Sequence, residues 1–129
     1  MVSIDGGTPY NSSYMDPSPP SCRQWYQSPT LHDGNHNIAI THIAATSVDF
    51  AVVTAGPSTN IVGTTLIVDD GDPAIAYQGP WSQQSNSWTS ADSPYVGLPY
   101  GNGTHRTTSA GASASFTFIG RSTFRRTSR

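Results

Sequence analysis

Three aspartates form the densest acidic group in the sequence. Asp69, Asp70 and Asp72 follow a short apolar run and stand just before Pro73. Carboxylate oxygens are the ligands that Ca²⁺ prefers, about six to eight for each ion, so the group is a candidate calcium site. The spacing is not that of an EF-hand, and the chain has no Glu to bind calcium in bidentate fashion. A turn in which Asp side chains accept bonds from nearby backbone N–H groups is therefore the preferred interpretation, with calcium as the alternative.

A second group of candidate residues is aromatic. Trp88, Tyr95 and Tyr100 stand among Gly, Ser, Asn and Pro, in a part of the chain that is predicted to be mostly loop. Aromatic rings in exposed loops stack on the apolar faces of sugars, and nearby amides and carboxylates bond the hydroxyls. These three residues are therefore the candidate ligand-binding set. The alternative is that the rings fill the core, as is predicted for Trp81, because large aliphatic residues are few.

No set of side chains with catalytic spacing occurs in the sequence. The histidines, His32, His36, His42 and His105, are scattered, and the G-x-S-x-G pattern of a serine nucleophile does not occur. The single Cys22 excludes a disulfide within the chain. We therefore expect no enzymatic activity. A glycosidase fragment, which would need two carboxylates facing one cleft, is the remaining enzymatic alternative.

Two N-glycosylation motifs begin at Asn11 and Asn102. Each places Asn two residues before Ser or Thr, which makes it an acceptor only in a secreted chain. The sequence as given opens with no charged segment followed by an apolar one, so no export signal is predicted. No apolar run approaches the roughly 20 residues that a membrane span requires. We expect glycosylation only if the chain reaches a secretory compartment.

The charged residues are few and unevenly placed. The 129 residues carry a formal net charge of -2, from six Arg and eight Asp, with neither Lys nor Glu, and only 11% of the chain is charged. This composition excludes helices held by ion pairs one turn apart and argues against a basic nucleic-acid-binding surface. Four of the six Arg lie in residues 121–129. The tail is interpreted as a non-native end, and a basic arm for anionic partners is the alternative.

Apolar and polar residues alternate with a period of two in several segments. The alternation runs through residues 36–43, 47–54 and 112–119, and shorter strand-like runs occupy residues 23–27, 64–68 and 74–77. Clusters of Gly, Pro, Asn and Asp separate these runs. Strands of this length with turns between them and no helical window predict an all-β sandwich.

Some of these segments resemble an extracellular module of basidiomycete fungal single-pass membrane proteins. Residues 23–31, 33–36 and 48–54 are similar to the closing half of that module, and residues 68–77, Trp81 and residues 110–118 are similar to its opening half. The resemblance implies an antiparallel jelly roll of the galactose-binding-like type. Such modules occur in tandem, before a low-complexity stretch and one membrane span.

The resemblance also implies how the chain is organised. Residues 1–55 would be the C-terminal half of one module, 56–63 a linker, 64–120 the N-terminal half of a second module, and 121–129 an atypical tail. The chain would then be a truncated fragment. Its two halves either close into a single sandwich or leave edge strands unpaired.

For function, the resemblance implies a non-catalytic structural or recognition role at a fungal cell surface. The expected partners are glycans or other cell-surface components and not nucleic acid, and no cofactor is expected beyond the candidate calcium ion. The alternative is a carbohydrate-binding module that contacts wall or environmental glycans through its loop aromatics.

Overall fold

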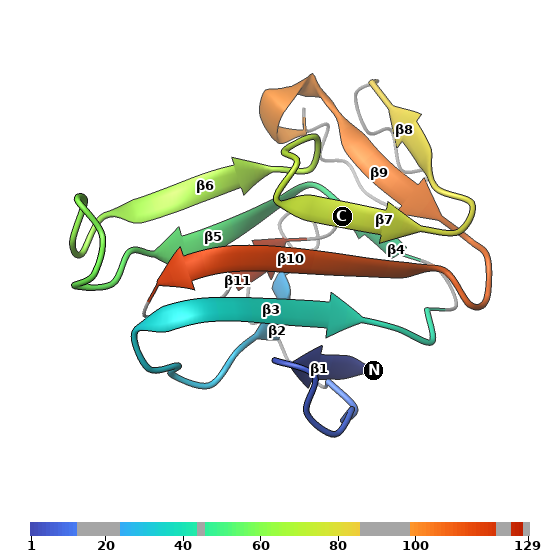
Figure 1. Cartoon of the computed structure of the whole chain (residues 1–129). Helices are drawn as coiled ribbons and strands as arrows, with labels where there is room; N and C mark the ends of the chain where they lie inside the picture. Colours follow the sequence, from blue (N-terminus) through green and yellow to red (C-terminus); the bar gives the residue numbers. More distant parts are fainter. Residues whose placement is uncertain (13–23, 44–45, 86–98, 121–124, 128–129) are drawn as a thin grey trace.

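The computed structural model describes residues 1–12, 24–43, 46–85, 99–120 and 125–127 (Figure 1). These residues form antiparallel β-strands and a short 3₁₀ turn, which confirms the all-β prediction. The elements are β1 (Val2–Ile4), β2 (Gln24–Gln27), β3 (Gly34–Ile40), β4 (Thr46–Val48), β5 (Phe50–Thr54), β6 (Thr65–Asp69), β7 (Ile75–Gln78), β8 (Ser82–Gln84), η2 (Tyr100–Asn102), β9 (Thr104–Thr107), β10 (Ser113–Gly120) and β11 (Arg125–Thr127).

The strands are arranged in three sheets. Sheet A has the order β1-β3-β10-β7, sheet B the order β2-β11-β5-β6, and sheet C the order β4-β9-β8. In Figure 1, β3, β10 and β7 lie in front of β5 and β11, and sheet C lies at one end of the two larger sheets. Sheets A and B thus form the two layers of a sandwich.

The core lies between these two layers and follows from the alternation of side chains. On β10, Phe116 and Phe118 are buried while Thr117 and Ile119 are exposed, as expected for a strand with one face against a core. Sheet B contributes Ala51 to the same apolar cluster. The remaining buried members of that cluster are Val2, Tyr26, Ile38, Val48, Val53 and Ile75.

Asp49 divides the segment 47–54, which alternation predicts as one continuous strand. The segment forms β4 in sheet C and β5 in sheet B, with Asp49 between them and only 3% exposed. The Asp49 carbonyl oxygen accepts the N–H of Asp70 at 2.9 Å, and its carboxylate accepts the N–H of Tyr100 at 2.8 Å. A buried carboxylate thus stands where the chain passes from one sheet to the other.

Strands that are distant in the sequence lie side by side. In sheet A, β3 pairs with β10 over seven residue pairs, from Ile40 with Ala114 to Gly34 with Gly120. In sheet B, β11 lies between β2 and β5. Residues 1–55 and 64–120 therefore share sheets, and part of the Arg-rich tail joins one of them. The assignment of these ranges to halves of two modules stays a prediction.

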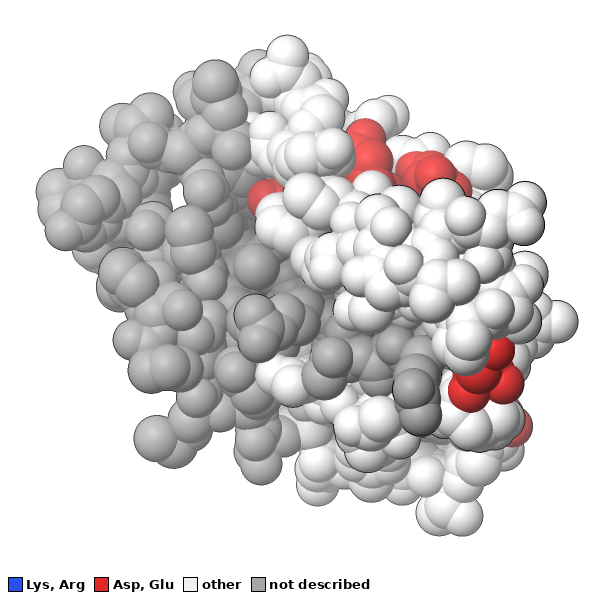
Figure 2. Space-filling view, turned by 90° about the vertical axis from the view of Figure 1, so that its left-hand side faces the viewer, with Lys and Arg blue, Asp and Glu red and all other residues white. Residues whose placement is uncertain are grey.

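The described surface carries few charges. Figure 2, which shows the molecule from the side where the loop between β5 and β6 projects, is white over most of its described area, with Asp the only charged residues visible. The described residues contain no apolar helix of membrane-spanning length.

Candidate functional site

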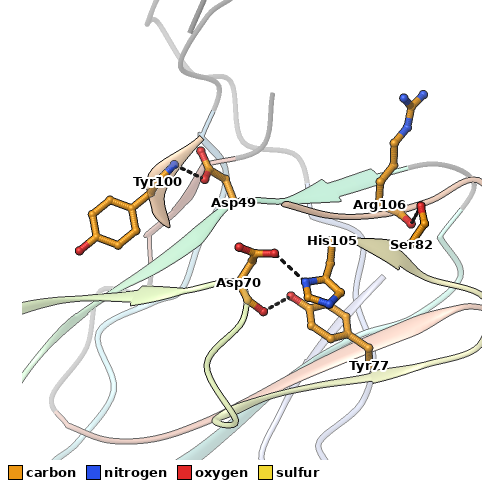
Figure 3. Close-up of polar contacts among 7 residues, drawn as sticks. All are labelled: Asp49, Asp70, Tyr77, Ser82, Tyr100, His105 and Arg106. Carbon is orange, nitrogen blue, oxygen red and sulfur yellow. Dashed lines mark hydrogen bonds and ion pairs between the residues drawn. The ribbon is translucent and has the colours of Figure 1, made fainter. Parts of the chain in front are cut away.

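The polar site of most interest lies where the three sheets meet (Figure 3). Asp70 follows β6 of sheet B, His105 belongs to β9 of sheet C, and Tyr77 belongs to β7 of sheet A. The turn η2, which begins at Tyr100, leads into β9. One residue or segment from each sheet therefore converges on a single cluster.

A short hydrogen bond joins Asp70 to His105. The distance from His105 Nδ1 to Asp70 Oδ2 is 2.6 Å. The Asp70 side chain is only 1% exposed and that of His105 is 20% exposed, so the imidazole stands between a buried carboxylate and solvent. Because a carboxylate only accepts, His105 Nδ1 carries the hydrogen of this bond. The arrangement fixes the orientation of the ring and places a polar group of β9 against the end of β6.

The pKa of Asp70 is raised above its ordinary value of 3.8. Burial is the largest cause, since it disfavours the charged carboxylate. The hydrogen bond from His105 lowers the pKa, whereas the neighbouring charge of Asp69 raises it, and the raising effects are the larger. Ionisation of Asp70 is therefore less favourable in the folded chain than in the unfolded chain.

Aromatic stacking completes the cluster. The rings of Tyr77 and His105 are nearly parallel, 12° apart in orientation, with centroids 4.2 Å apart. The Tyr77 hydroxyl donates to the carbonyl oxygen of Asp70 at 2.9 Å. The Trp81 ring packs against Tyr77, with ring centroids 4.8 Å apart. The Trp81 indole nitrogen lies 3.1 Å from the Ser113 carbonyl oxygen. These contacts hold the imidazole on a rigid aromatic base.

The carboxylates of Asp49 and Asp69 lie against the Tyr100 turn. The Tyr100 N–H donates to the buried Asp49, and its ring packs on Phe50 with a centroid distance of 5.6 Å. Tyr100 nevertheless remains 46% exposed. Gly101 follows with φ of 63°, and a Cβ added there would stand 2.5 Å from Asp69 Oδ2. The turn thus requires glycine at this position and presents an aromatic ring in a defined orientation.

A second His–Asp pair lies at the opposite end of sheet A. His36 is 2% exposed, its Nδ1 lies 2.8 Å from Asp5 Oδ2, and its Nε2 lies 2.8 Å from the His32 carbonyl oxygen. Both partners are acceptors, so both ring nitrogens carry hydrogen when both bonds form. Burial lowers the pKa of His36, but the bonds to Asp5 and His32 outweigh it and the net shift is upward. The hydrogen bond between His36 and Asp5 thus connects the turn after β1 to β3.

The three aspartates of the predicted acidic group make different contacts. Asp70 bonds His105, whereas Asp72 Oδ1 accepts the Ala74 N–H at 2.8 Å, as an Asp in a turn does. Asp69 Oδ1 is buried and has no hydrogen-bond partner among the described residues. Within that same part of the chain, no three His, Cys, Asp or Glu side chains gather as metal ligands would. Calcium binding by Asp69, Asp70 and Asp72 stays a prediction.

The structure describes some, but not all, of the predicted aromatic and glycosylation residues. Tyr100 is exposed beside the Asp70 cluster, whereas Trp88 and Tyr95 lie outside the described residues. Asn11 and Asn102 are both exposed, although the Thr104 side chain of the second motif is buried. Exposure of the Asn side chains is compatible with glycosylation, which stays a prediction.

Sequence reasoning missed both His–Asp pairs. Asp70 and His105 are 35 residues apart and Asp5 and His36 are 31 residues apart, so no local motif marks them. The one available signal was that His36 falls in phase with Ile38 and Ile40 on the buried face of β3. A histidine at such a position requires hydrogen-bond partners.

Comparison of the chain with protein-family models, with curated proteins and with solved structures gives no match.

Proposed function

We propose that this chain is a non-catalytic recognition module of an extracellular, fungal-type cell-surface protein, with strands arranged as in a galactose-binding-like jelly roll. The observation that carries the proposal is the fixed and exposed ring of Tyr100. An aromatic ring that needs no ordering on binding loses little entropy when a ligand stacks on it. The resemblance of the sequence to extracellular modules supports the setting.

The polar contacts of the site support a role in recognition over one in catalysis. His105 uses Nδ1 in its bond to Asp70 and stacks on the Tyr77 ring, and His36 uses both of its nitrogens within the fold. Both pairs connect strands that are far apart in the sequence. Their geometry is that of contacts that position the surface turns.

Carbohydrate is the ligand class that the Tyr100 turn favours. A sugar ring stacks its apolar face on an aromatic side chain and offers its hydroxyls to neighbouring polar groups. Here the exposed Asn102 is part of the same turn, and His105 lies on the adjoining strand. Binding to glycans of a cell wall or of the surroundings is therefore the specific form of the proposed function.

The test is a binding screen with soluble β-glucan, chitin oligosaccharides, mannan and galactan. We expect at least one of these to retard the protein in affinity electrophoresis and to release no reducing sugar on prolonged incubation. The variant Tyr100→Ala should lose the retardation. Ile119→Ala, which removes an exposed apolar side chain from β10 of sheet A, is the control and should keep it. Hydrolysis of any of the four polysaccharides would overturn the non-catalytic assignment.

A further inference from the structure

The outer strand of sheet B has backbone groups that face an open edge. The Ala55 N–H donates to the Thr64 carbonyl oxygen at 2.8 Å, and the Asp70 N–H donates to the Asp49 carbonyl oxygen at 2.9 Å. Because hydrogen-bonded pairs alternate along an antiparallel ladder, the residues of β6 that bond β5 are those in phase with Thr64 and Asp70. The N–H and C=O groups of Thr65 and Ile67 therefore point away from β5, on the side where sheet B has no further described strand.

The same edge is apolar. Leu66 and Ile67 of β6 are 37% and 48% exposed, and Ile61 and Val62 in the preceding loop are 45% and 62% exposed. These four residues, here called the β6 edge patch, are half of the large hydrophobic residues that are exposed in the described part of the chain. The segment from Phe50 to Val68 contains no charged residue. The edge strand β6 carries neither charge nor proline from Thr65 to Val68, and its one charged residue is Asp69 at its end. The uncharged part is unprotected against pairing with another strand.

The loop that carries Ile61 and Val62 is held in place. The Thr59 N–H and hydroxyl both donate to the Gly56 carbonyl oxygen, the Thr64 N–H donates to Ile61, and the Ser58 N–H donates to Asp33 across a gap of 25 residues. The apolar side chains are thus presented on an ordered hairpin, which projects at one side of the molecule in Figure 1. This order lowers the entropic cost of docking.

We propose that the β6 edge patch is the interface of a symmetric dimer, in which β6 of one chain pairs antiparallel with β6 of a second copy. Pairing centred on Ile67 brings outward-facing backbone groups of both copies into register. Each Asp69 then stands opposite Thr65 of the other copy, so no like charges meet. The two sheets B become one continuous eight-stranded sheet, and the exposed Leu66 and Ile67 side chains are covered.

The chemistry of the edge favours a strand over a lipid surface as the partner. Backbone N–H and C=O groups need hydrogen-bond partners, which acyl chains do not supply. A second copy supplies them in the matching register and carries the same uncharged segment. Closed two-fold pairing of one patch with itself is also the commonest form of protein self-association.

The test is sedimentation equilibrium of the full chain across a range of concentrations. Because a single strand pair buries a small area, we expect a dimer with a Kd of about 10–100 µM. Ile67→Lys should be monomeric throughout this range, since a charge at the centre of the pair faces its symmetry mate. Ile119→Lys, an exposed isoleucine on β10 of sheet A, is the matched control and should dimerise like the unmodified chain.

A second variant isolates the backbone contribution. Ile67→Pro removes an N–H that faces the open edge and leaves the bonds between β5 and β6 in place. It should abolish the dimer while the thermal transition remains cooperative. Should either position 67 variant fail to fold, amide exchange of the unmodified chain decides: protection at Thr65 and Ile67 must rise with protein concentration. A chain that is monomeric at about ten times the expected Kd, or that gains mass only on phosphatidylcholine vesicles, overturns the proposal.

Discussion

His105 Nδ1 lies 2.6 Å from Asp70 Oδ2, and this one hydrogen bond joins sheet C to sheet B. The stacked Tyr77 ring, whose hydroxyl donates to the Asp70 carbonyl oxygen, adds sheet A to the junction. The three sheets are thus connected through the buried carboxylate of Asp70, whose pKa is raised by burial. Its neighbours Asp49 and Asp69 lie under the Tyr100 turn, so the stability of this junction and the shape of the candidate binding turn are coupled.

The two partners of this bond should respond differently to substitution. His105→Ala leaves the Asp70 carboxylate buried without its donor and should cost about 2–3 kcal/mol in the free energy of unfolding. Asp70→Asn keeps an acceptor for the His105 N–H and removes the buried charge, so it should cost less than about 1 kcal/mol at pH 7. Chemical denaturation of both variants checks this order, and equal losses would contradict it.

The pH dependence of Asp70→Asn follows from the raised pKa of Asp70. A carboxyl whose pKa is higher in the folded than in the unfolded chain stabilises the fold below its ordinary value of 3.8, and that contribution is lost as pH rises through the folded pKa. The variant lacks this loss. Its stability relative to the unmodified chain should therefore increase as pH rises from 3.8 through the folded pKa of Asp70. A constant or decreasing difference over this interval would refute the burial argument.

The His36 and Asp5 pair should stabilise the protein most in mildly acid solution. The upward pKa shift of His36 gives a contribution that is complete below its ordinary value of 6.5 and is lost as pH rises through the folded pKa. The pKa of Asp5 is lowered, first by the Asn37 N–H and then by His36, so its contribution is present above 3.8 and is lost as pH falls through the folded pKa. The window of greatest stability lies between these limits.

Asp5→Asn tests this window. The variant removes the charge that raises the pKa of His36, although Asp33 adds a smaller effect of the same sign. We expect the decline in stability above pH 6.5, the ordinary pKa of His36, to become shallower, because burial then opposes protonation of His36 with less compensation. Asn35→Gln, at an exposed residue next to His36 on β3, should leave the unmodified profile. Urea unfolding at several pH values provides the measurement.

Gly101 is predicted to be the least replaceable glycine of the candidate binding turn. Gly101→Ala places a methyl group 2.5 Å from the Asp69 carboxylate in addition to imposing a left-handed backbone. Gly63→Ala imposes a similar backbone, with φ of 73°, where no atom lies within 4 Å, and should cost about 1–2 kcal/mol. Gly101→Ala should cost at least about 1 kcal/mol more than this. Similar thermal shifts in the two variants would show that the Asp69 contact does not constrain the turn.

The alternation of residues was sufficient to predict most of the strands but not how they join. Ile38 and Ile40, or Phe116 and Phe118, carry the period of two locally, and β3 and β10 lie close to where that period places them. Asp49 is different because its backbone and side-chain partners, Asp70 and Tyr100, come from 21 and 51 residues further along. A buried polar residue takes its position from such distant groups, so neither the break between β4 and β5 nor the Asp70 site can be seen in a local pattern.

The proposed glycan binding depends on the aromatic ring of Tyr100 and not on its hydroxyl group. Tyr100→Phe keeps the ring that stacks and loses only the hydroxyl, whereas Tyr100→Ala removes the stacking surface. The backbone bond from residue 100 to Asp49 is available in all three proteins, so the turn should persist.

Isothermal titration calorimetry of the glycan retained in the binding screen, with these three proteins, is the most direct test. The account predicts a Kd for Tyr100→Phe within about threefold of the unmodified chain and a loss of at least about tenfold for Tyr100→Ala, equal to about 1.4 kcal/mol. Undiminished binding by a folded Tyr100→Ala protein would contradict it.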